Sequence, residues 1–102
     1  MKAKIHSREQ RGQTIEILAL CDASLIGKVF ESKNAVLDLK TYKAFYDGEK
    51  VTEKKAIELV LKYKNLNVVG EKSVKAACKA LGLPLTRAKK IGGVPHLQIY
   101  FV

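Results

Sequence analysis

A histidine beside a glycine turn is the feature of this sequence best suited to chemistry. His96 follows the run Ile91-Gly92-Gly93-Val94-Pro95 near the end of the 102-residue chain. Histidine can act as a general base, donate to an anion or bind a metal ion, because its pKa lies near neutrality. The two glycines permit positive φ angles and Pro95 holds its own φ, so we expect His96 to begin a strand after a turn. A structural histidine at a strand edge is the other interpretation, and the one that we favour.

A catalytic role for His96 requires a nucleophile within reach. Cys21, Cys78 and Ser24 are the candidates, and the sequence does not define their distances to His96. The two cysteines form no CxxC pair, and together with His6 and His96 they match no known ligand spacing. We therefore expect no metal, no cofactor and no disulfide, and we assign no catalytic residue.

Positive charge gathers in the second part of the chain. The chain contains nineteen Lys and Arg residues and ten Asp and Glu residues, which gives a net charge of +9. Residues 62–102 hold eight basic residues and one acidic residue, a net of +7. This asymmetry predicts a polyanionic partner for the C-terminal half, and a merely solubilising surface is the alternative.

Six of these basic residues are predicted to form a nucleic-acid-binding patch. Spacings of three and four place the first three on one outer helix face, and the others follow the end of that helix. Such a patch can track a phosphate backbone. The residues are Lys72, Lys75, Lys79, Arg87, Lys89 and Lys90.

Two further stretches have two interpretations each. Gly70 precedes a predicted helix, and free amides at a helix start can bind phosphate. However, Glu71 would oppose an anion there, so we favour ordinary capping. The three aromatic residues between Tyr42 and Tyr46 form either a stacking surface for bases or, as we favour, a loop folded onto the core.

Apolar periodicity predicts the elements that position these residues. Strands are expected at Lys2–His6, Thr14–Cys21, Ala35–Leu39 and His96–Phe101, with a loop at Ser7–Gln13 and helices at Ser24–Phe30, Glu53–Lys64 and Glu71–Leu81. Asp22 is expected to cap the first helix, Thr52 the second, and Gly82 to end the third. The buried sides are Leu97, Ile99 and Phe101 in the last strand, Ala56, Ile57, Val60 and Leu61 in the second helix, and Val74, Ala77, Cys78 and Leu81 in the third.

Interleaved strands and helices predict an α+β fold, or a mixed-sheet α/β sandwich, in which two main helices cover a small sheet. The length predicts a single domain over residues 1–102. Because no apolar run reaches the length of a membrane span and the N-terminus lacks a signal-peptide core, we expect a cytoplasmic protein.

The order of the glycine-containing segments carries a family resemblance. It runs from Asp22 through Asn67-x-Val69-Gly70-Glu71-Lys72 to Ile91-Gly92-Gly93-Val94-Pro95-His96. In this order the chain resembles the DUF424 family, small archaeal proteins that form a domain of unknown function. The resemblance implies a cytosolic, translation-related protein without an established activity. It assigns no catalytic residue, so Gly70, Gly92, Gly93, Pro95 and His96 are motif positions without a known role.

Three functions follow from these observations. The leading hypothesis is a non-catalytic RNA-binding or ribonucleoprotein-associated module, because the positive charge of the C-terminal half favours a polyanionic partner. The second is a small enzyme built around His96 and the Gly92-Gly93 turn. The third is a protein-interaction module that pairs through an exposed edge strand.

Overall fold

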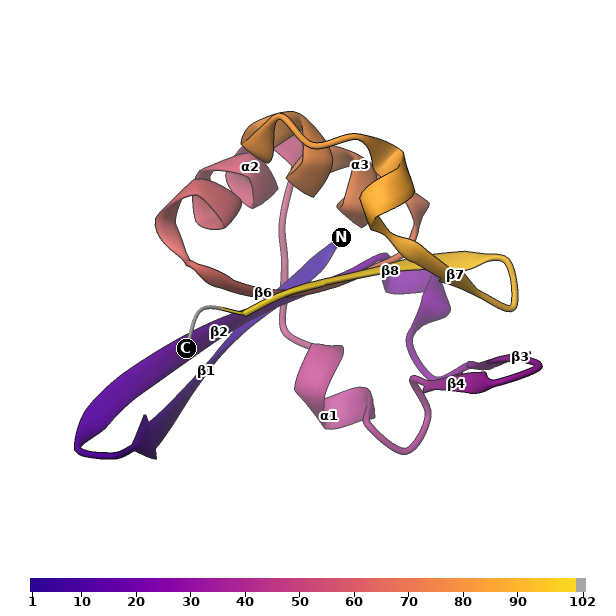
Figure 1. Cartoon of the computed structure of the whole chain (residues 1–102), viewed down its shortest axis with the longest axis horizontal. Coiled ribbons are helices and arrows are strands. Elements are labelled where there is room, and N and C mark those ends of the chain that lie inside the picture. Colours follow the sequence, from indigo (N-terminus) through magenta and orange to yellow (C-terminus); the bar gives the residue numbers. More distant parts are fainter. Residues whose placement is uncertain (101–102) are drawn as a thin grey trace.

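The computed structural model describes residues 1–100, in which a six-stranded sheet carries helices on both faces (Figure 1). The strands lie in the order β5, β1, β2, β6, β8, β7. Their bounds in that order are Glu49–Lys50, Lys2–Gln10, Gln13–Cys21, Asn65–Val69, Val94–Ile99 and Lys89–Ile91. Strands β2 and β6 run parallel, and the other neighbours run antiparallel. The mixed sheet with its helices confirms the α+β class.

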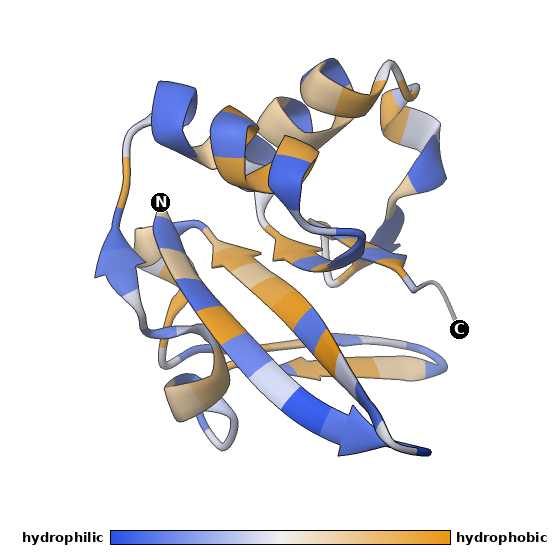
Figure 2. Cartoon of the chain, turned by 90° about the vertical axis from the view of Figure 1, so that its left-hand side faces the viewer, coloured by the Kyte–Doolittle hydropathy of each residue, from blue (hydrophilic) through white to orange (hydrophobic). Residues whose placement is uncertain are grey.

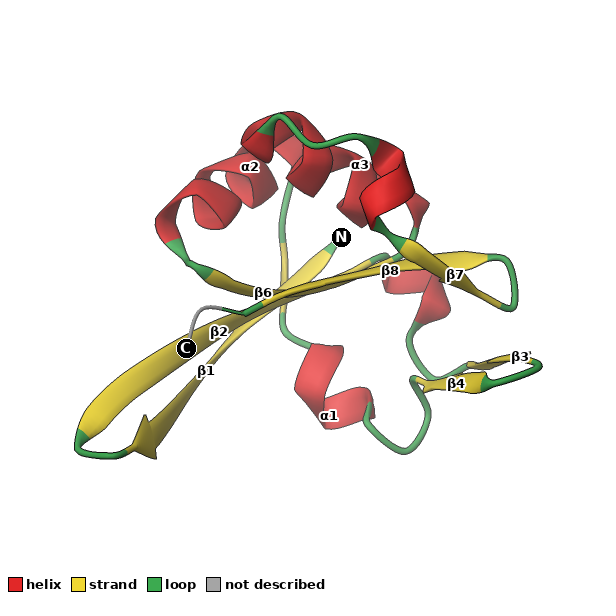
Figure 3. Cartoon of the chain, in the orientation of Figure 1, coloured by secondary structure: helices red, strands yellow, loops and turns green. Residues whose placement is uncertain are grey.

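Two layers cover this sheet. The helices α2 (Glu53–Lys62) and α3 (Glu71–Leu81) lie on one face, called the helical face. The single-turn helix α1 (Lys43–Tyr46) and a hairpin of β3 (Val29–Ser32) and β4 (Ala35–Asp38) lie under the other, called the α1 face (Figure 3). Within residues 1–100, no helix is both long and apolar enough to cross a membrane.

Each face of the sheet has its own hydrophobic core. On the helical face, the sheet residues Leu18, Leu20, Leu66, Val68 and Leu97 pack against α2 and α3. On the α1 face, Ala19, Cys21 and Val69 pack against β4 and α1. Strands β2 and β6 are therefore buried on both faces.

The predicted start of α2 and both predicted ends of α3 are confirmed, whereas α2 ends at Lys62 rather than at Lys64. The Oγ1 of Thr52 accepts a hydrogen bond from the Lys55 amide at 3.2 Å, which caps α2. Helix α3 has the predicted bounds and ends at Gly82, whose φ of 66° is left-handed. Both ends follow from local chemistry, because side-chain caps and C-terminal glycines act within one turn.

The helix predicted at Ser24–Phe30 is wrong. Only a 3₁₀ turn at Ala23–Leu25 forms, and the chain then enters β3. Gly27 adopts a φ of 90°, and its amide donates to the Leu39 carbonyl at 2.9 Å. This left-handed residue breaks the helical path and turns the chain into the β3–β4 hairpin.

The loop predicted at Ser7–Gln13 is also wrong. Strand β1 continues to Gln10, and the chain turns at Arg11 and Gly12, with φ angles of 53° and 76°. Two positive φ angles define the tight turn that suits a twisted hairpin. The outer end of this hairpin is hydrophilic (Figure 2), so it shows no apolar alternation that a sequence pattern can detect.

Two residues that were expected in the core are exposed in the structure. Leu61 is 64% exposed and Leu81 is 37% exposed, whereas Leu59 and Tyr63 pack against the core. The buried face of α2 is therefore rotated from the predicted one.

Strand β8 begins at Val94 rather than His96, with Leu97 buried and Ile99 partly buried. The expected burial of Phe101 lies outside the described residues.

Candidate functional site

A pocket of about 470 Å³ opens on the α1 face of the sheet. Its walls come from β4, α1, the segment between them, β6 and β8. Three residues are aliphatic, three aromatic and three polar: Val36, Leu37 and Leu39; Tyr42, Phe45 and Tyr46; and Asp38, Asn67 and His96. Small-molecule sites typically combine such a volume with mostly apolar walls and a few convergent polar groups.

A hydrogen-bond network joins three of the lining side chains. The Oδ1 of Asn67 accepts from the Tyr46 hydroxyl at 3.0 Å and lies 2.8 Å from Nε2 of His96. An amide oxygen only accepts, so Nε2 carries the proton and Nδ1 of the neutral ring is an acceptor. In the described part of the chain, Nδ1 of His96 and Nδ2 of Asn67 make no hydrogen bond, and neither atom is fully buried, so one acceptor and one donor are accessible to a ligand.

Burial keeps the two titratable members of this network uncharged. It raises the pKa of Tyr46 to about 12, against the opposing effect of the hydrogen bond with Asn67. It lowers the pKa of His96, because the charged imidazolium loses solvation. At neutral pH the phenol is therefore a donor and the imidazole is neutral.

Strand register brings Asn67 and His96 onto the α1 face. Val69 pairs with His96 and Asn67 with Gln98 in the antiparallel β6–β8 ladder. Paired residues share a face, and alternate residues of a strand return to it. Asn67 is thus a polar side chain within a strand whose neighbours Leu66 and Val68 fill the core of the helical face.

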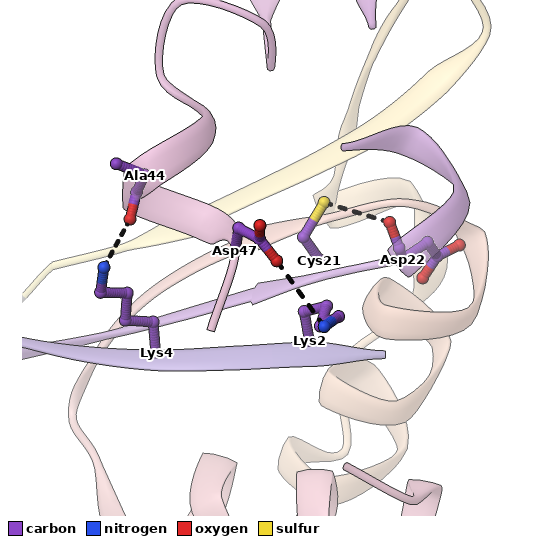
Figure 4. A network of polar contacts seen from close by, with 6 residues as sticks. All are labelled: Lys2, Lys4, Cys21, Asp22, Ala44 and Asp47. Carbon is purple, nitrogen blue, oxygen red and sulfur yellow. Dashed lines mark hydrogen bonds and ion pairs between the residues drawn. The ribbon is translucent and has the colours of Figure 1, made fainter. Parts of the chain in front are cut away.

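Contacts with β1 hold α1, and with it the aromatic wall. The Nζ of Lys4 donates to the Ala44 carbonyl at 2.7 Å (Figure 4). The Nε2 of His6 lies 2.8 Å from the Phe45 carbonyl, and the two rings stack with centroids 4.2 Å apart. One face of the Phe45 ring is therefore occupied by His6 while the side chain also lines the pocket.

Asp38 supplies a negative charge to the pocket. Its Oδ1 accepts from the amides of Thr41 at 2.8 Å and Lys40 at 3.1 Å. These hydrogen bonds, with that of Thr41 the stronger, hold the pKa of Asp38 below its usual range. The carboxylate is therefore ionised at neutral pH, and Oδ2 is able to accept from a ligand.

The candidate nucleophiles do not combine with His96 into an activated pair. Burial raises the pKa of the Cys21 thiol to about 12, with the nearby Asp22 adding to the effect, so the thiol stays protonated. Its Sγ–H points to the Asp22 carbonyl at 3.4 Å (Figure 4). Cys78 belongs to α3 on the helical face, and Ser24 is exposed.

The two cysteines and two histidines also do not form a common site. Cys21 and His96 lie on the α1 face, whereas Cys78 lies on the helical face. In the described part of the chain, no three His, Cys, Asp or Glu side chains gather in a way that would hold a metal ion. The expectation that the protein binds no metal remains a prediction.

The N-terminus of α3 is occupied by a carboxylate of the protein itself. Asp22 accepts from the Lys72 amide at 3.1 Å and from the amide and hydroxyl of Ser73 at 2.8 and 2.7 Å. Gly70 has a φ of 104°, and a Cβ there would lie 2.4 Å from Cγ of Asp22. Gly70 is therefore required for this close approach, and the amides are used in capping instead of binding phosphate.

The prediction that Asp22 caps a helix at Ser24–Phe30 is wrong for the same reason. Strands β2 and β6 run parallel and end side by side, with the Asp22 amide donating to the Val69 carbonyl at 3.0 Å. The side chain following β2 therefore reaches the helix that follows β6.

The other motif positions build the turn before His96. Gly92 and Gly93 have φ angles of 56° and 82° and form a two-residue turn between the paired Ile91 and Val94. The Gly92 amide donates to Oγ of Ser32 in β3 at 2.6 Å. The carbonyl of Pro95 accepts from the Gly70 amide at 2.9 Å. These positions are structural, and His96 alone among them lines the pocket.

The predicted basic residues are all exposed but do not share one surface. Lys75 and Lys90 line the same groove of about 280 Å³ between α3 and β7. Lys72 and Lys79 lie on α3, where Nζ of Lys79 is 3.9 Å from Glu53 of α2. The set formed by Lys72, Lys75, Lys79 and Lys90 is called the α3 basic surface.

The remaining two cations lie elsewhere. Arg87 lines a separate groove with Tyr63 and Leu81. Lys89 pairs with His96 in the β7–β8 ladder, so it projects on the α1 face next to the pocket. Adjacent residues of a strand face opposite sides, which separates Lys89 from Lys90. Nucleic-acid binding by these residues stays a prediction.

Sequence reasoning missed the polar partners of His96. Asn67 lies in the apolar run Leu66-Asn67-Val68-Val69, and a polar residue inside such a buried strand was a usable signal. Tyr46 was noted only as a member of the aromatic cluster, and Asp38 carried no signal, because the roles of both residues in the pocket depend on how α1 and β4 fold under the sheet.

Together these features define an α+β protein with a mixed sheet, a Gly-Gly hairpin turn and a pocket with polar side chains at its base. The family described as "Protein of unknown function (DUF424)" matches residues 9–102, so the chain belongs to this family, as its motifs predicted. A crystal structure of an uncharacterized conserved protein from Methanopyrus kandleri is similar at 28% identity with a TM-score of 0.75. The match covers 97% of this chain and 89% of that chain. A comparison with curated proteins gave no match.

Proposed function

We propose that this protein is a non-catalytic RNA-binding module that contacts phosphates through the α3 basic surface. The observation that carries this proposal is the exposure of Lys72, Lys75 and Lys79 on α3, with Lys90 beside the same groove as Lys75. Cations on one surface can follow a phosphate backbone without reading its sequence.

Neighbouring acids neutralise this surface only weakly. Lys79 and Glu53 are 3.9 Å apart with side chains 73% and 62% exposed. An ion pair so exposed contributes about 0–1 kcal/mol and is screened by salt, so a phosphate can replace the carboxylate. Glu71 is the acid that shares the groove with Lys75 and Lys90.

Salt-dependent binding of single-stranded RNA tests the proposal. Contact with about four phosphates gives a slope near −3 for log affinity against log salt, so affinity should fall ~50-fold between about 50 and about 200 mM salt. The measurement is fluorescence anisotropy of a labelled RNA of mixed sequence. Joint replacement of Lys72, Lys75 and Lys79 by glutamine should weaken binding and flatten the slope.

A second triple variant controls for net charge. Lys28, Lys33 and Lys50 are exposed and lie on the β3–β4 side of the molecule or in β5. Their joint change to glutamine removes the same charge and should leave the slope nearly unchanged. Equal losses in both triple variants would show that only overall charge matters, and an absence of binding at low salt would refute the proposal.

A small enzyme centred on His96 is the second candidate function. The observation in its favour is the buried Asn67–His96–Tyr46 network at the base of the pocket, which holds a neutral imidazole. A neutral imidazole can act as a general base. The protonated Cys21 thiol supplies no nucleophile, so such an enzyme would have to activate a group of its substrate or a water molecule.

A further inference from the structure

The pocket on the α1 face offers both stacking surfaces and directed polar groups. Aromatic side chains of α1 and of the segment before it form one wall, and β6 and β8 form the polar base. We propose that this pocket binds a nucleobase with an exocyclic amino group, in a nucleotide whose phosphate is contacted by Lys89. The inference concerns the opposite face of the sheet from the α3 basic surface, so it can succeed or fail independently of the proposed RNA binding.

The aromatic wall is suited to a flat ring. The Phe45 ring is fixed by its stack on His6, whose ring plane differs from it by 2°. Tyr42 is 63% exposed although it lines the pocket, so its ring is available to a ligand. Stacking of a base on an aromatic side chain typically changes affinity by about fivefold to a hundredfold or more.

The polar groups distinguish amino-bearing bases from uracil. His96 presents an acceptor at Nδ1, Asn67 a donor at Nδ2, and Asp38 an ionised acceptor at Oδ2. An exocyclic amino group donates to such acceptors, while a neighbouring ring nitrogen or carbonyl accepts from the amide. Uracil has a carbonyl where cytosine has the amino group. This carbonyl oxygen would lie opposite an acceptor of the protein, and two acceptors cannot form a hydrogen bond.

A cation stands beside this base site. Lys89 is the direct strand partner of His96 and is exposed. Side chains of paired residues on neighbouring strands lie close enough to contact one molecule. Lys89 forms no ion pair with any of the described residues, so its ammonium group can reach a phosphate, and a nucleotide should bind more tightly than the corresponding nucleoside.

The test compares cytidine and uridine monophosphate, which differ chiefly at the discriminating group. Each is added at millimolar concentrations to isotope-labelled protein, and NMR shifts of the Asn67 side-chain amide and the His96 ring are followed. We expect saturable shifts with about tenfold or tighter affinity for the cytidine nucleotide. Short oligocytidylate and oligouridylate strands form a second arm, which separates a free nucleotide from an unpaired base of a strand.

Two variants and a control connect the shifts to the pocket. Tyr42→Ala should weaken the cytidine nucleotide about tenfold, because a stacking face is lost. Asp38→Asn keeps an oxygen for the Thr41 amide but removes the charge, so it should narrow the preference for cytidine over uridine. Leu61→Ala changes an exposed apolar residue of α2 and should alter neither affinity.

The outcomes separate the proposal from its alternatives. Pocket shifts with the mononucleotide support a free-nucleotide site, and shifts with the strand alone support recognition of an unpaired base. Unchanged pocket resonances with both probes would overturn the proposal. Equal affinities for the cytidine and uridine forms would overturn recognition of the amino group. Loss of RNA binding in the α3 triple variant with intact pocket shifts would leave this inference in place.

Discussion

Replacing Asp22 by alanine should remove the side-chain hydrogen bonds that join the end of β2 to the start of α3. The carboxylate accepts three hydrogen bonds from Lys72 and Ser73, and Ser73 is fully buried. Loss of a helix cap costs about 0.5–2 kcal/mol. A buried hydroxyl left without its partner adds about 1–3 kcal/mol. We therefore expect the free energy of unfolding to fall by about 2–4 kcal/mol.

Two controls isolate the cap from the charge. Asp22→Asn keeps an oxygen that can accept from Ser73 and loses only the favourable charge at the helix start, so it should cost about 1 kcal/mol. Asp47→Ala removes a different aspartate, whose exposed ion pair with Lys2 has a distance of 3.6 Å (Figure 4). This second change should cost no more than about 1 kcal/mol.

Urea unfolding followed by circular dichroism measures these differences, with an unchanged m-value as the sign that the denatured state is unaffected. Thermal unfolding of Asp22→Ala should shift down by about 10–25 °C, given the size of the domain. A double-mutant cycle with Ser73→Ala should show a coupling above about 0.5 kcal/mol. The reasoning is refuted if Asp22→Ala costs no more than Asp47→Ala, or if the two sites do not couple.

Three further predictions follow from the same structure. Gly70→Ala should lower the free energy of unfolding by about 2 kcal/mol or more, because the new Cβ meets Asp22 at a φ of 104°; a stability equal to that of the parent in urea would contradict the assigned contact. Burial lowers the pKa of His96 from its ordinary value of 6.5, so below that pH the unfolded chain binds more protons than the folded one. The stability that the neutral ring contributes is present above pH 6.5 and is lost as the pH falls. Between about pH 7 and about pH 5, the free energy of unfolding should therefore fall more in the parent than in His96→Gln. Equal losses in the two proteins would show that His96 is not responsible. Finally, Cys21 and Cys78 are buried, with the pKa of each thiol raised by burial, so alkylation by iodoacetamide should be slow in the native protein and fast in urea. Rapid modification of the native protein, measured by mass spectrometry, would indicate that one of these elements opens readily.

Sequence by itself determined the parts of this protein that depend on neighbours along the chain. Thr52 and Gly82 mark helix ends because a cap acts within one helical turn. Gly92 and Gly93 mark a turn because both positions need positive φ. The glycine-containing segments likewise predicted the family, which the match over residues 9–102 confirms.

Only the tertiary structure decided which side chains meet. Asp22 caps a helix that begins about fifty residues later, because β2 and β6 are parallel neighbours. The pocket joins Asn67 of β6, His96 of β8 and Tyr46 of α1, and the last of these is placed by packing of α1 against β1. Lys89 and Lys90 project from opposite faces of the sheet because successive strand residues alternate. Contacts of this kind depend on strand order and register, and no periodicity in the chain specifies either one.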